Sequence, residues 1–382
     1  MSWLNNIGIL HYHASLVADV DRVDRFRDAI HEVVRPGDVV VDIGTGTGLL
    51  AYFACQAGAA RVFAIEEGPI IELAREIAMI NRLDDRVEFF NDRSYRVQLP
   101  EQADVLVSET LWNFGVGEGM IGTLTDARRR FLKPGARVIP EAVDLHVAPV
   151  QADGVYAMLH DRPPDRDGLD LSPIRYYQVN NVHMPHLSDE NFLAKPALLV
   201  STELDGSAEA DFEADVTVLA TRSGVMHGTC GWFRSRLSPS VVLENEPPSV
   251  KSSWAHAFFP VLNPIAVQTG DEISLHIETA DDGTIWRWRT ELRRAGTVVA
   301  SYDQSSSLGF PVARGLPGRD GAAAGPRTTL RGEVVSWVLD GMDGTRSLTQ
   351  LEADVLQRFG SRFAEPADAL EIVRDAVQTL GA

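Results

Sequence analysis

The first hydrophobic pattern in the chain has a helical period. Apolar residues recur every three or four positions from Ser15 to Val34, which predicts one amphipathic helix there. Further on, short apolar runs alternate with helical patterns. The runs lie at 37–44, 61–67, 86–90, 103–109 and 136–141, and the helical patterns at 69–83 and 120–132. This alternation is typical of a doubly wound α/β domain with a mostly parallel sheet, which we assign to residues 1–140.

The pattern changes after residue 140. Alternating strands separated by Gly, Asp and Pro predict an antiparallel β-barrel or sandwich over 141–312, with a polar insert at about 162–195. The expected strands are 143–150, 197–204, 210–221, 227–237, 272–280 and 284–292. A Gly/Pro/Ala-rich linker at 313–328 precedes a small C-terminal α+β unit at 329–382.

Composition narrows the possible partners. The formal net charge of −19 argues against nucleic-acid binding, which needs a basic surface, and is compatible with a cationic ligand. No apolar run is long enough to span a membrane, and the start of the chain lacks the pattern of a secretory signal. Cys55 and Cys230 lie in apolar stretches, as buried thiols of a reducing compartment do. We therefore expect a cytoplasmic protein without membrane contact.

The stretch "VVVDIGTGTGLLAYF" contains the strongest signal for a ligand. A strand ends at Asp42, and a glycine turn then opens a helix; its glycines are Gly44, Gly46 and Gly48. Leu49 stands where the dinucleotide fingerprint has its third glycine, so the turn fits a ligand without a pyrophosphate. Glu66 ends the next strand, where a carboxylate can bind both ribose hydroxyls. These features together predict a nucleoside site.

Two glutamates lie in "SETLWNFGVGEGM", between an apolar strand and a helix. Ligands of an open α/β sheet bind at the carboxyl ends of its strands, so Glu109 and Glu118 are candidates for holding a cation. Each could instead be an acid stabilised by the dipole of a nearby helix N-terminus. His11, His13 and His256 have no partners at metal-ligand spacing, and we expect no metal.

The nucleoside motif resembles that of the class I S-adenosylmethionine-dependent methyltransferases, and the glutamate pair resembles the double-E hairpin of the arginine N-methyltransferases. The resemblance implies a Rossmann-like domain, S-adenosyl-L-methionine as cofactor, and Glu109 and Glu118 as the catalytic pair. Other stretches match the family in order. "HASLVADVDR" resembles its N-terminal helix, in which Arg22 would bind the cofactor's carboxylate, and Met120 matches a methionine after the second glutamate.

The resemblance extends into the second domain. "RVIPEAVDLHVAPV" resembles the strand that enters the family's β-barrel, and "SSWAHAFFPVLNPIAVQTGDEI" its Thr-His-Trp loop and the following strand. Ser253 and Trp254 of that loop are expected to bind substrate. The insert at 162–195 sits where the family has a dimerisation arm, which implies a homodimer.

Departures from the family pattern fall on the substrate side. Ser252 and Ser253 replace the Thr and His of the loop, so Asp19 loses the histidine with which the family's aspartate pairs. Tyr95 stands for an acidic residue near the adenine, and Asn113 for a tyrosine of the hairpin. The N-terminal aromatic motif is largely missing; Trp3 and Ile7 occupy its positions. The cofactor side is intact, which indicates the same reaction on a different substrate.

A guanidinium suits such a glutamate pair. It stays protonated, so its nitrogens are poor nucleophiles until two carboxylates bind it and concentrate the charge away from the third nitrogen. We expect methylation of a guanidino nitrogen, most simply of free L-arginine or a small guanidino compound, in bacterial specialised metabolism such as antibiotic biosynthesis. Two alternatives remain open: an arginine in a protein or peptide, and a scaffold that binds the cofactor without catalysis. The C-terminal unit has a faint likeness to winged-helix domains that bind peptide precursors; packing or dimerisation is the other reading.

Overall fold

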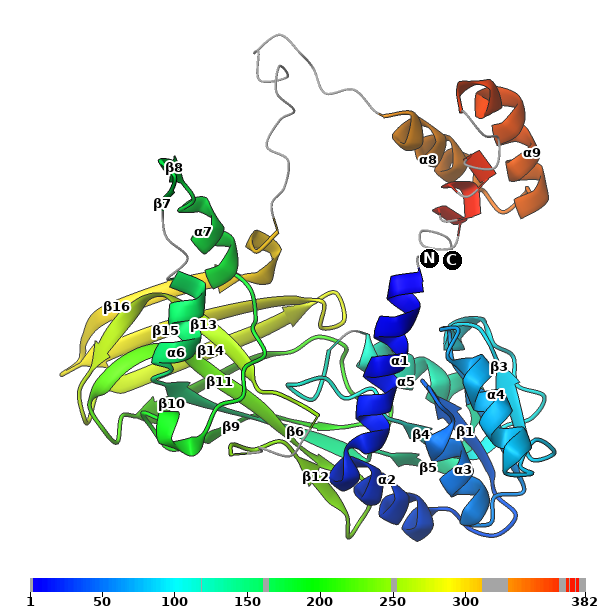
Figure 1. Ribbon diagram of the computed structural model, residues 1–382, viewed down its shortest axis with the longest axis horizontal. Coiled ribbons are helices and arrows are strands. Elements are labelled where there is room, and N and C mark those ends of the chain that lie inside the picture. The colour runs from blue at the N-terminus through cyan, green and yellow to red at the C-terminus, as the bar shows by residue number, and fades with distance from the viewer. Residues whose placement is uncertain are drawn as a thin grey trace. The chain divides into compact units, whose positions relative to one another are not determined.

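The structure is a computed structural model that describes residues 3–117, 119–160, 165–248, 253–310, 329–363 and, of 369–377, all but 371 and 375. Two compact units are present, Met1–Pro311 and Val312–Ala382 (Figure 1). Glu118 and Ser252 lie outside the described residues, as do the side chains of Trp3 and Ile7.

The first domain contains the expected parallel sheet. Its strand order is β3-β2-β1-β4-β5, and each neighbouring pair is parallel. The strands are β1 (Val39–Ile43), β2 (Arg61–Ile65), β3 (Val87–Phe90), β4 (Ala103–Ser108) and β5 (Leu132–Ile139). The helices that follow β1, β2 and β4 are α3 (Leu49–Gln56), α4 (Ile71–Ile80) and α5 (Met120–Phe131). Ile43 of β1 lies between Ile65 of β2 and Ser108 of β4, so the carboxyl ends of these three strands meet at one edge.

The N-terminal helix differs from the prediction. The single helix expected from Ser15 to Val34 is two helices, α1 (Trp3–Ala18) and α2 (Val20–Val33). Asp19 separates them in an extended conformation, and its carboxylate accepts a hydrogen bond from the backbone N–H of Arg22 at 3.2 Å. Aspartate is a preferred N-cap, so it starts a new helix although the apolar period continues across it.

The second domain is the expected antiparallel barrel, built from two sheets. One has the order β10-β14-β15-β16; the other has the order β12-β11-β6-β9, with β13 paired to β11. The strands are β6 (Ala142–Val150), β9 (Ala197–Glu203), β10 (Glu213–Leu219), β11 (Gly224–Arg236), β12 (Val242–Glu244), β13 (Ala257–Val267), β14 (Glu272–Ala280), β15 (Ile285–Arg294) and β16 (Thr297–Ser305). We did not predict β12 or β16.

The polar insert leaves the barrel between β6 and β9. It contains α6 (Asp153–His160), the short strands β7 (Asp165–Arg166) and β8 (Leu169–Asp170), and α7 (Pro173–Val179) (Figure 1). Several apolar side chains in it are exposed, namely Leu169, Ile174 and Tyr176. None of the helices in the described part of the chain is long and apolar enough to cross a membrane.

The second unit has a small core of its own. It contains α8 (Leu330–Gly341), α9 (Leu348–Phe359) and further helical residues within 369–377. Its buried side chains are Val334, Val338, Leu351, Val355, Phe359, Ala369, Ile372, Val373 and Ala376. Ser347 and Gln350 form a reciprocal capping box that starts α9. The helices of the expected α+β unit are present, and the part of the unit that the structure describes contains no strand.

Candidate active site

The glycine turn after β1 requires its glycines. Gly44, Gly46 and Gly48 all have left-handed backbone conformations, with φ of 73°, 54° and 84°. A Cβ on Gly48 would lie 2.3 Å from the hydroxyl of Tyr52. That hydroxyl donates to the carbonyl of Ala74 in α4 at 2.5 Å and lies 3.1 Å from the carbonyl of Thr47 in the turn. The backbone conformation and the nearby Tyr52 therefore leave no place for a side chain at Gly48.

Two acids form hydrogen bonds with the turn. Asp42 is fully buried, and its Oδ2 accepts a hydrogen bond from the hydroxyl of Thr45 at 2.5 Å. Its Oδ1 has no partner among the residues that the structure describes, and burial raises the pKa of Asp42 to about 7. Glu66 follows β2 and accepts hydrogen bonds from the backbone N–H groups of Gly46 at 3.1 Å and Gly68 at 2.7 Å.

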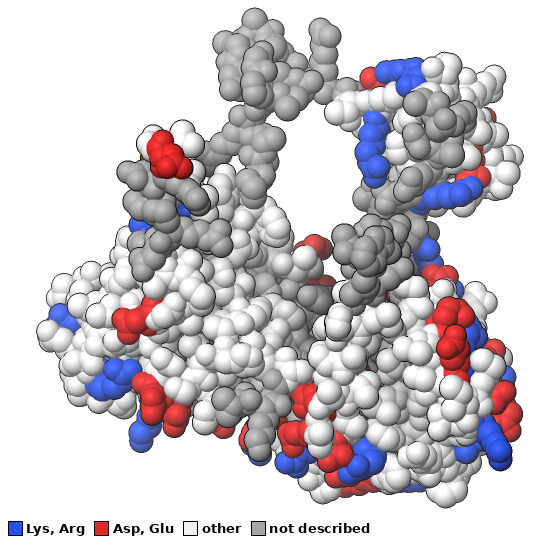
Figure 2. Space-filling model, in the orientation of Figure 1, with Lys and Arg blue, Asp and Glu red and all other residues white. Residues whose placement is uncertain are grey.

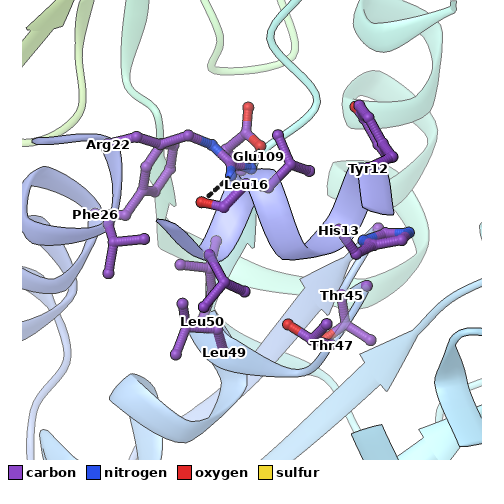
Figure 3. A pocket seen from close by; sticks show the side chains of 14 residues that line it. Tyr12, His13, Leu16, Arg22, Phe26, Thr45, Thr47, Leu49, Leu50 and Glu109 are labelled. Carbon is purple, nitrogen blue, oxygen red and sulfur yellow. Dashed lines mark hydrogen bonds and ion pairs between the residues drawn. The ribbon is translucent and has the colours of Figure 1, made fainter. Parts of the chain in front are cut away.

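A cavity of about 150 Å³ lies between the glycine turn and the first two helices (Figure 3). Arg22 lines it and donates a hydrogen bond from Nη1 to the carbonyl of Leu16 at 3.0 Å. The other Nη of Arg22 forms an ion pair with the carboxylate of Glu109, which lines the same cavity. Burial lowers the pKa of Arg22 to about 10, so the side chain is still charged near neutral pH.

A second cavity of about 410 Å³ adjoins the turn at Gly44. Gly44 lines both cavities, while Glu66, Thr110 and Tyr95 line the second. Tyr95 is half exposed, and its hydroxyl accepts a hydrogen bond from Arg93 at 3.0 Å. The predicted cofactor residues Arg22, Gly44, Gly46, Glu66 and Tyr95 therefore line two cavities that share Gly44, whereas Asp42 and Gly48 line neither.

The loop that follows Glu109 is fastened to the barrel domain. The indole Nε1 of Trp254 donates to the carbonyl of Leu111 at 3.0 Å, and the backbone N–H of Ala255 donates to Oδ1 of Asn113 at 2.8 Å. Asn245 donates from its amide to the carbonyls of Asn113 at 3.0 Å and Ala255 at 2.8 Å. Asn113, which stands for the family's tyrosine, is thus a link between the two domains.

The three residues expected to bind substrate do not line either cavity. Met120 is the first residue of α5 and is buried in the main hydrophobic core. Trp254 is also buried, with the guanidinium of Arg22 5.5 Å from its ring centroid. Ser253 is exposed, and its backbone N–H donates to Oδ2 of Asp19 at 2.5 Å. Asp19 therefore has a backbone donor where the family would offer a histidine.

Tyr12 and His13 were not among the predicted site residues, yet both line the first cavity (Figure 3). A Cβ on Gly46 would lie 3.0 Å from Nδ1 of His13, so α1 passes directly over the glycine turn. Burial lowers the pKa of His13, which favours its neutral form. The signal was available, because His13 begins the same motif from which we selected Arg22.

The residues present fit S-adenosylmethionine. Nε of Arg22 is buried without a hydrogen-bond partner among the described residues, and such a guanidinium suits a carboxylate ligand. The two cavities reach the backbone of the glycine turn, and Glu66, where a ribose would be bound, lines the second of them. Within the described ranges, no cluster of three or more His, Cys, Asp or Glu side chains could hold a metal ion.

Comparison with known proteins agrees with this geometry. Residues 28–141 match the family model "Ribosomal protein L11 methyltransferase (PrmA)", and residues 141–290 match "Arginine methyltransferase oligomerization subdomain". An arginine N(omega)-methyltransferase of Streptomyces achromogenes subsp. streptozoticus is 29% identical over 278 residues, which cover 71% of this chain and 76% of that protein. Protein arginine N-methyltransferase 6 of Xenopus laevis is 28% identical over 276 residues, which cover 69% and 81%.

Solved structures show the same fold. The PRMT1 enzyme–prozyme heterotetrameric complex of Trypanosoma brucei with AdoHcy has a TM-score of 0.70 at 23% identity, covering 77% of this chain and 96% of that one. Protein arginine methyltransferase 10 of Arabidopsis thaliana has a TM-score of 0.67 at 22% identity, with 78% and 97% covered. By sequence over residues 28–290 and by fold, the chain is therefore similar to the S-adenosylmethionine-dependent arginine N-methyltransferases.

Proposed function

We propose that this enzyme methylates a guanidino nitrogen of free L-arginine or of a small guanidino compound. The observation that carries the proposal is the place of Glu109. Its carboxylate lies at the end of β4, in the cavity formed by the glycine turn, and it already binds a guanidinium there, that of Arg22. A substrate guanidinium bound to Glu109 would therefore lie next to the cofactor.

The proposed roles rest on the resemblance to the family and, for the described residues, on their place in the fold. Glu109 and Glu118 are the catalytic acids. Met120, Ser253 and Trp254 are the proposed substrate-binding residues, although none of them lines either cavity. The cofactor-binding residues are Arg22, Asp42, Gly44, Gly46, Gly48, Glu66 and Tyr95. Tyr12 and His13 join this set because they line the first cavity.

When bound, S-adenosylmethionine supplies an electrophilic methyl group on a sulfonium. Glu109 and Glu118 hold the guanidinium by fork-shaped hydrogen bonds and draw its charge toward the nitrogens that they contact. The third nitrogen then gains lone-pair character and is aimed at the methyl group, so most of the catalysis is orientation and electrostatics. One of the two carboxylates takes the proton that the nitrogen loses.

The departures from the family pattern and the name of one relative motivate the choice of a small substrate. Asn113 replaces the family's tyrosine in the loop after Glu109, where it is hydrogen-bonded to Asn245 and Ala255 of the barrel domain. The Streptomyces relative carries a name that specifies arginine and mentions no protein. We extend this to a role in specialised metabolism such as antibiotic biosynthesis.

Methyl transfer from labelled S-adenosylmethionine by the full-length protein tests the proposal. Free L-arginine should accept label with a higher kcat/KM than an arginine-containing peptide. Glu118→Gln should lower turnover by about 100-fold or more, as removal of a catalytic acid does, and leave cofactor binding nearly unchanged. The matched control is Glu101→Gln, because Glu101 is an exposed glutamate paired with Arg61. Turnover of Glu118→Gln equal to wild type would refute the proposed mechanism.

The alternative substrate is an arginine in a basic peptide or protein. The net charge of −19 would attract such a partner, and the Xenopus relative is named as a protein methyltransferase. On the face in Figure 2, acidic and basic side chains are interspersed and form no single basic patch. A higher kcat/KM for the peptide than for free arginine would select this alternative.

We also propose a cytoplasmic homodimer, with domains at 1–140, 141–312 and 329–382, and a linker at 313–328. Apolar side chains are exposed on the insert (Leu169, Ile174 and Tyr176) and on helices of the first domain (Leu10, Val17, Met79 and Ile80), where an interface would cover them. Residues 141–290, which include most of the barrel, match the family model of the arginine methyltransferase oligomerization subdomain. A monomeric mass by light scattering at micromolar concentration would contradict the dimer.

A further inference from the structure

The turn between β14 and β15 is unusually constrained. It contains Asp281, Asp282 and Gly283, and all three have left-handed conformations, with φ of 57°, 53° and 73°. Non-glycine residues adopt this conformation at a cost in free energy, although aspartate tolerates it better than most. Two such residues in a row store backbone strain that surrounding contacts can offset. The contacts are made with the loop that carries the second glutamate.

Asp282 binds the start of α5 twice. Its backbone carbonyl accepts a hydrogen bond from the N–H of Gly119 at 3.0 Å. Its carboxylate accepts from the N–H of Gly122, with its two oxygens at 3.2 and 3.4 Å from that nitrogen. A carboxylate in this place satisfies a free N–H group of the first helical turn and interacts favourably with the helix dipole.

The rest of the β14–β15 turn also contacts the loop that precedes α5. A Cβ on Gly283 would lie 2.9 Å from Cα of Gly117, so the two backbones are in direct contact. The N–H of Gly283 in turn donates to the carboxylate of Asp211 at 3.2 Å. Beside the turn, Trp286 of β15 stacks on Trp112 of the loop, with ring centroids 5.2 Å apart and planes inclined by 27°.

The loop needs such external contacts because its own backbone is permissive. Gly115 and Gly119 have left-handed conformations, with φ of 78° and 79°, and Gly117 has a φ of 159°. Glycine gives the chain the widest choice of backbone conformations, so these positions would not fix the loop without a partner. Glu118 is bonded to Gly117 and Gly119, and the β14–β15 turn contacts both of them.

We propose that Asp282 is a positioning residue for methyl transfer: from the barrel domain, it fixes the segment of the first domain that carries the catalytic Glu118. The role of Glu118 rests on the proposed function, whereas the contact of Asp282 with Gly119 and Gly122 does not. Asp282 contacts neither cofactor nor substrate in this proposal; it acts through the loop. Its loss should lower kcat and leave cofactor affinity unchanged.

The test compares two neighbouring aspartates in the full-length protein. Asp282→Ala should lower kcat at least tenfold and change the Kd for S-adenosylhomocysteine less than twofold. Asp281→Ala is the matched control, because Asp281 has the same left-handed conformation but an exposed side chain, so the strain of alanine is common to both variants. Asp282→Asn should recover most of the activity, because its amide oxygen can accept the hydrogen bond from Gly122. Equal kcat values for Asp282→Ala and Asp281→Ala would overturn the proposal.

A second variant tests the same contact by a substitution in α5. Gly122→Ala would place a Cβ 2.3 Å from Oδ2 of Asp282, so it should displace the carboxylate and lower kcat as Asp282→Ala does. In the Asp282→Ala background it should cause no further loss, because the obstructing carboxylate is gone. Gly154→Ala in α6, with open space at its Cβ, is the control and should behave as wild type. Additive losses in the double variant would contradict the contact.

Amide hydrogen exchange separates this proposal from the proposed function. Asp282→Ala should speed exchange in the segment 115–124, and Asp281→Ala should not. If the wild-type protein methylates no guanidine, the function fails, but the exchange result still decides whether Asp282 holds the loop. Unchanged exchange in Asp282→Ala would reject the proposal even in an active enzyme.

Discussion

The guanidinium of Arg22 and the carboxylate of Glu109 form an ion pair inside the first cavity. One of them is proposed to bind the cofactor and the other the substrate, so the ion pair competes with both ligands for these side chains. The pair is largely buried, with 13% and 9% of the two side chains exposed. A substrate guanidinium would bind Glu109 more readily once Arg22 has another anionic partner, and the cofactor's carboxylate is a suitable one. Cofactor binding should therefore precede substrate binding.

Glu109→Gln should consequently strengthen cofactor binding while it removes activity. A neutral amide competes poorly for Arg22, so the cofactor's carboxylate would no longer displace a charged partner. We expect the Kd for S-adenosylhomocysteine to fall on the order of three- to tenfold, where tenfold corresponds to about 1.4 kcal/mol. Isothermal titration calorimetry checks this, with Glu101→Gln as the control. Weaker binding by Glu109→Gln would show that the acid helps the cofactor and does not compete with it.

The cofactor side of the site could be predicted from sequence because its chemistry is local. Asp42 and the glycine turn lie in one short stretch, and Glu66 ends the next strand of a regular β-α-β pattern. The pairing of Arg22 with Glu109 could not be predicted in this way. It joins two elements that lie far apart in the chain, and each residue type alone fits either a ligand or an internal partner.

Prediction of the barrel from the sequence had the same limit, because it depended on local patterns. Strands with a regular alternation, such as β14 and β15, were predicted nearly to their ends, whereas β16, "TVVASYDQS", was missed because polar residues fill its second half. The contact of Asp282 with α5 depends on how two domains pack. No local pattern distinguishes Asp282 from Asp281, and only the fold shows which of them faces the loop.

Asp42 should make the stability of the cofactor-free protein depend on pH. Its pKa is raised to about 7 in the folded state, against about 3.9 when unfolded, so between these values the folded state binds a proton that the unfolded state lacks. Stability due to Asp42 is therefore greatest at low pH and is lost as the pH rises through about 7. In Asp42→Asn this dependence disappears.

Urea unfolding of wild type and Asp42→Asn measures the effect. From pH 5 to pH 8, the free energy of unfolding of wild type should fall relative to that of the variant by on the order of 2 kcal/mol. Glu66→Gln provides a check, because a nearby negative charge is one of the causes of the raised pKa of Asp42, so its removal should shift the transition to lower pH. Parallel curves for wild type and Asp42→Asn would contradict the prediction.

Asp19 should contribute to stability through two hydrogen bonds. Its carboxylate accepts from the backbone N–H of Arg22 at the start of α2 and from that of Ser253 in the barrel domain. Asp19→Ala leaves both donors unpaired and should cost about 1–3 kcal/mol of unfolding free energy. Asp19→Asn keeps an acceptor and should cost clearly less. The control is Asp28→Ala on the exposed side of α2, which should change stability by about 0.5 kcal/mol or less. Equal stabilities of Asp19→Ala and Asp28→Ala would show that Asp19 does not hold the two elements.

Removal of residues 313–382 should leave methylation of free arginine intact. The second unit has its own core, and all the site residues that the structure describes belong to the first unit. The kcat/KM for free L-arginine should therefore stay within about twofold of wild type, a change in barrier of less than about 0.5 kcal/mol. If the unit recognises a peptide, the KM for the peptide should rise while the kcat for arginine does not change. If it serves in packing, light scattering should show a different mass or soluble aggregates. A large loss of kcat on free arginine from a monodisperse, cofactor-binding truncation would contradict the expectation, because it would mean that the second unit contributes to the catalytic site itself.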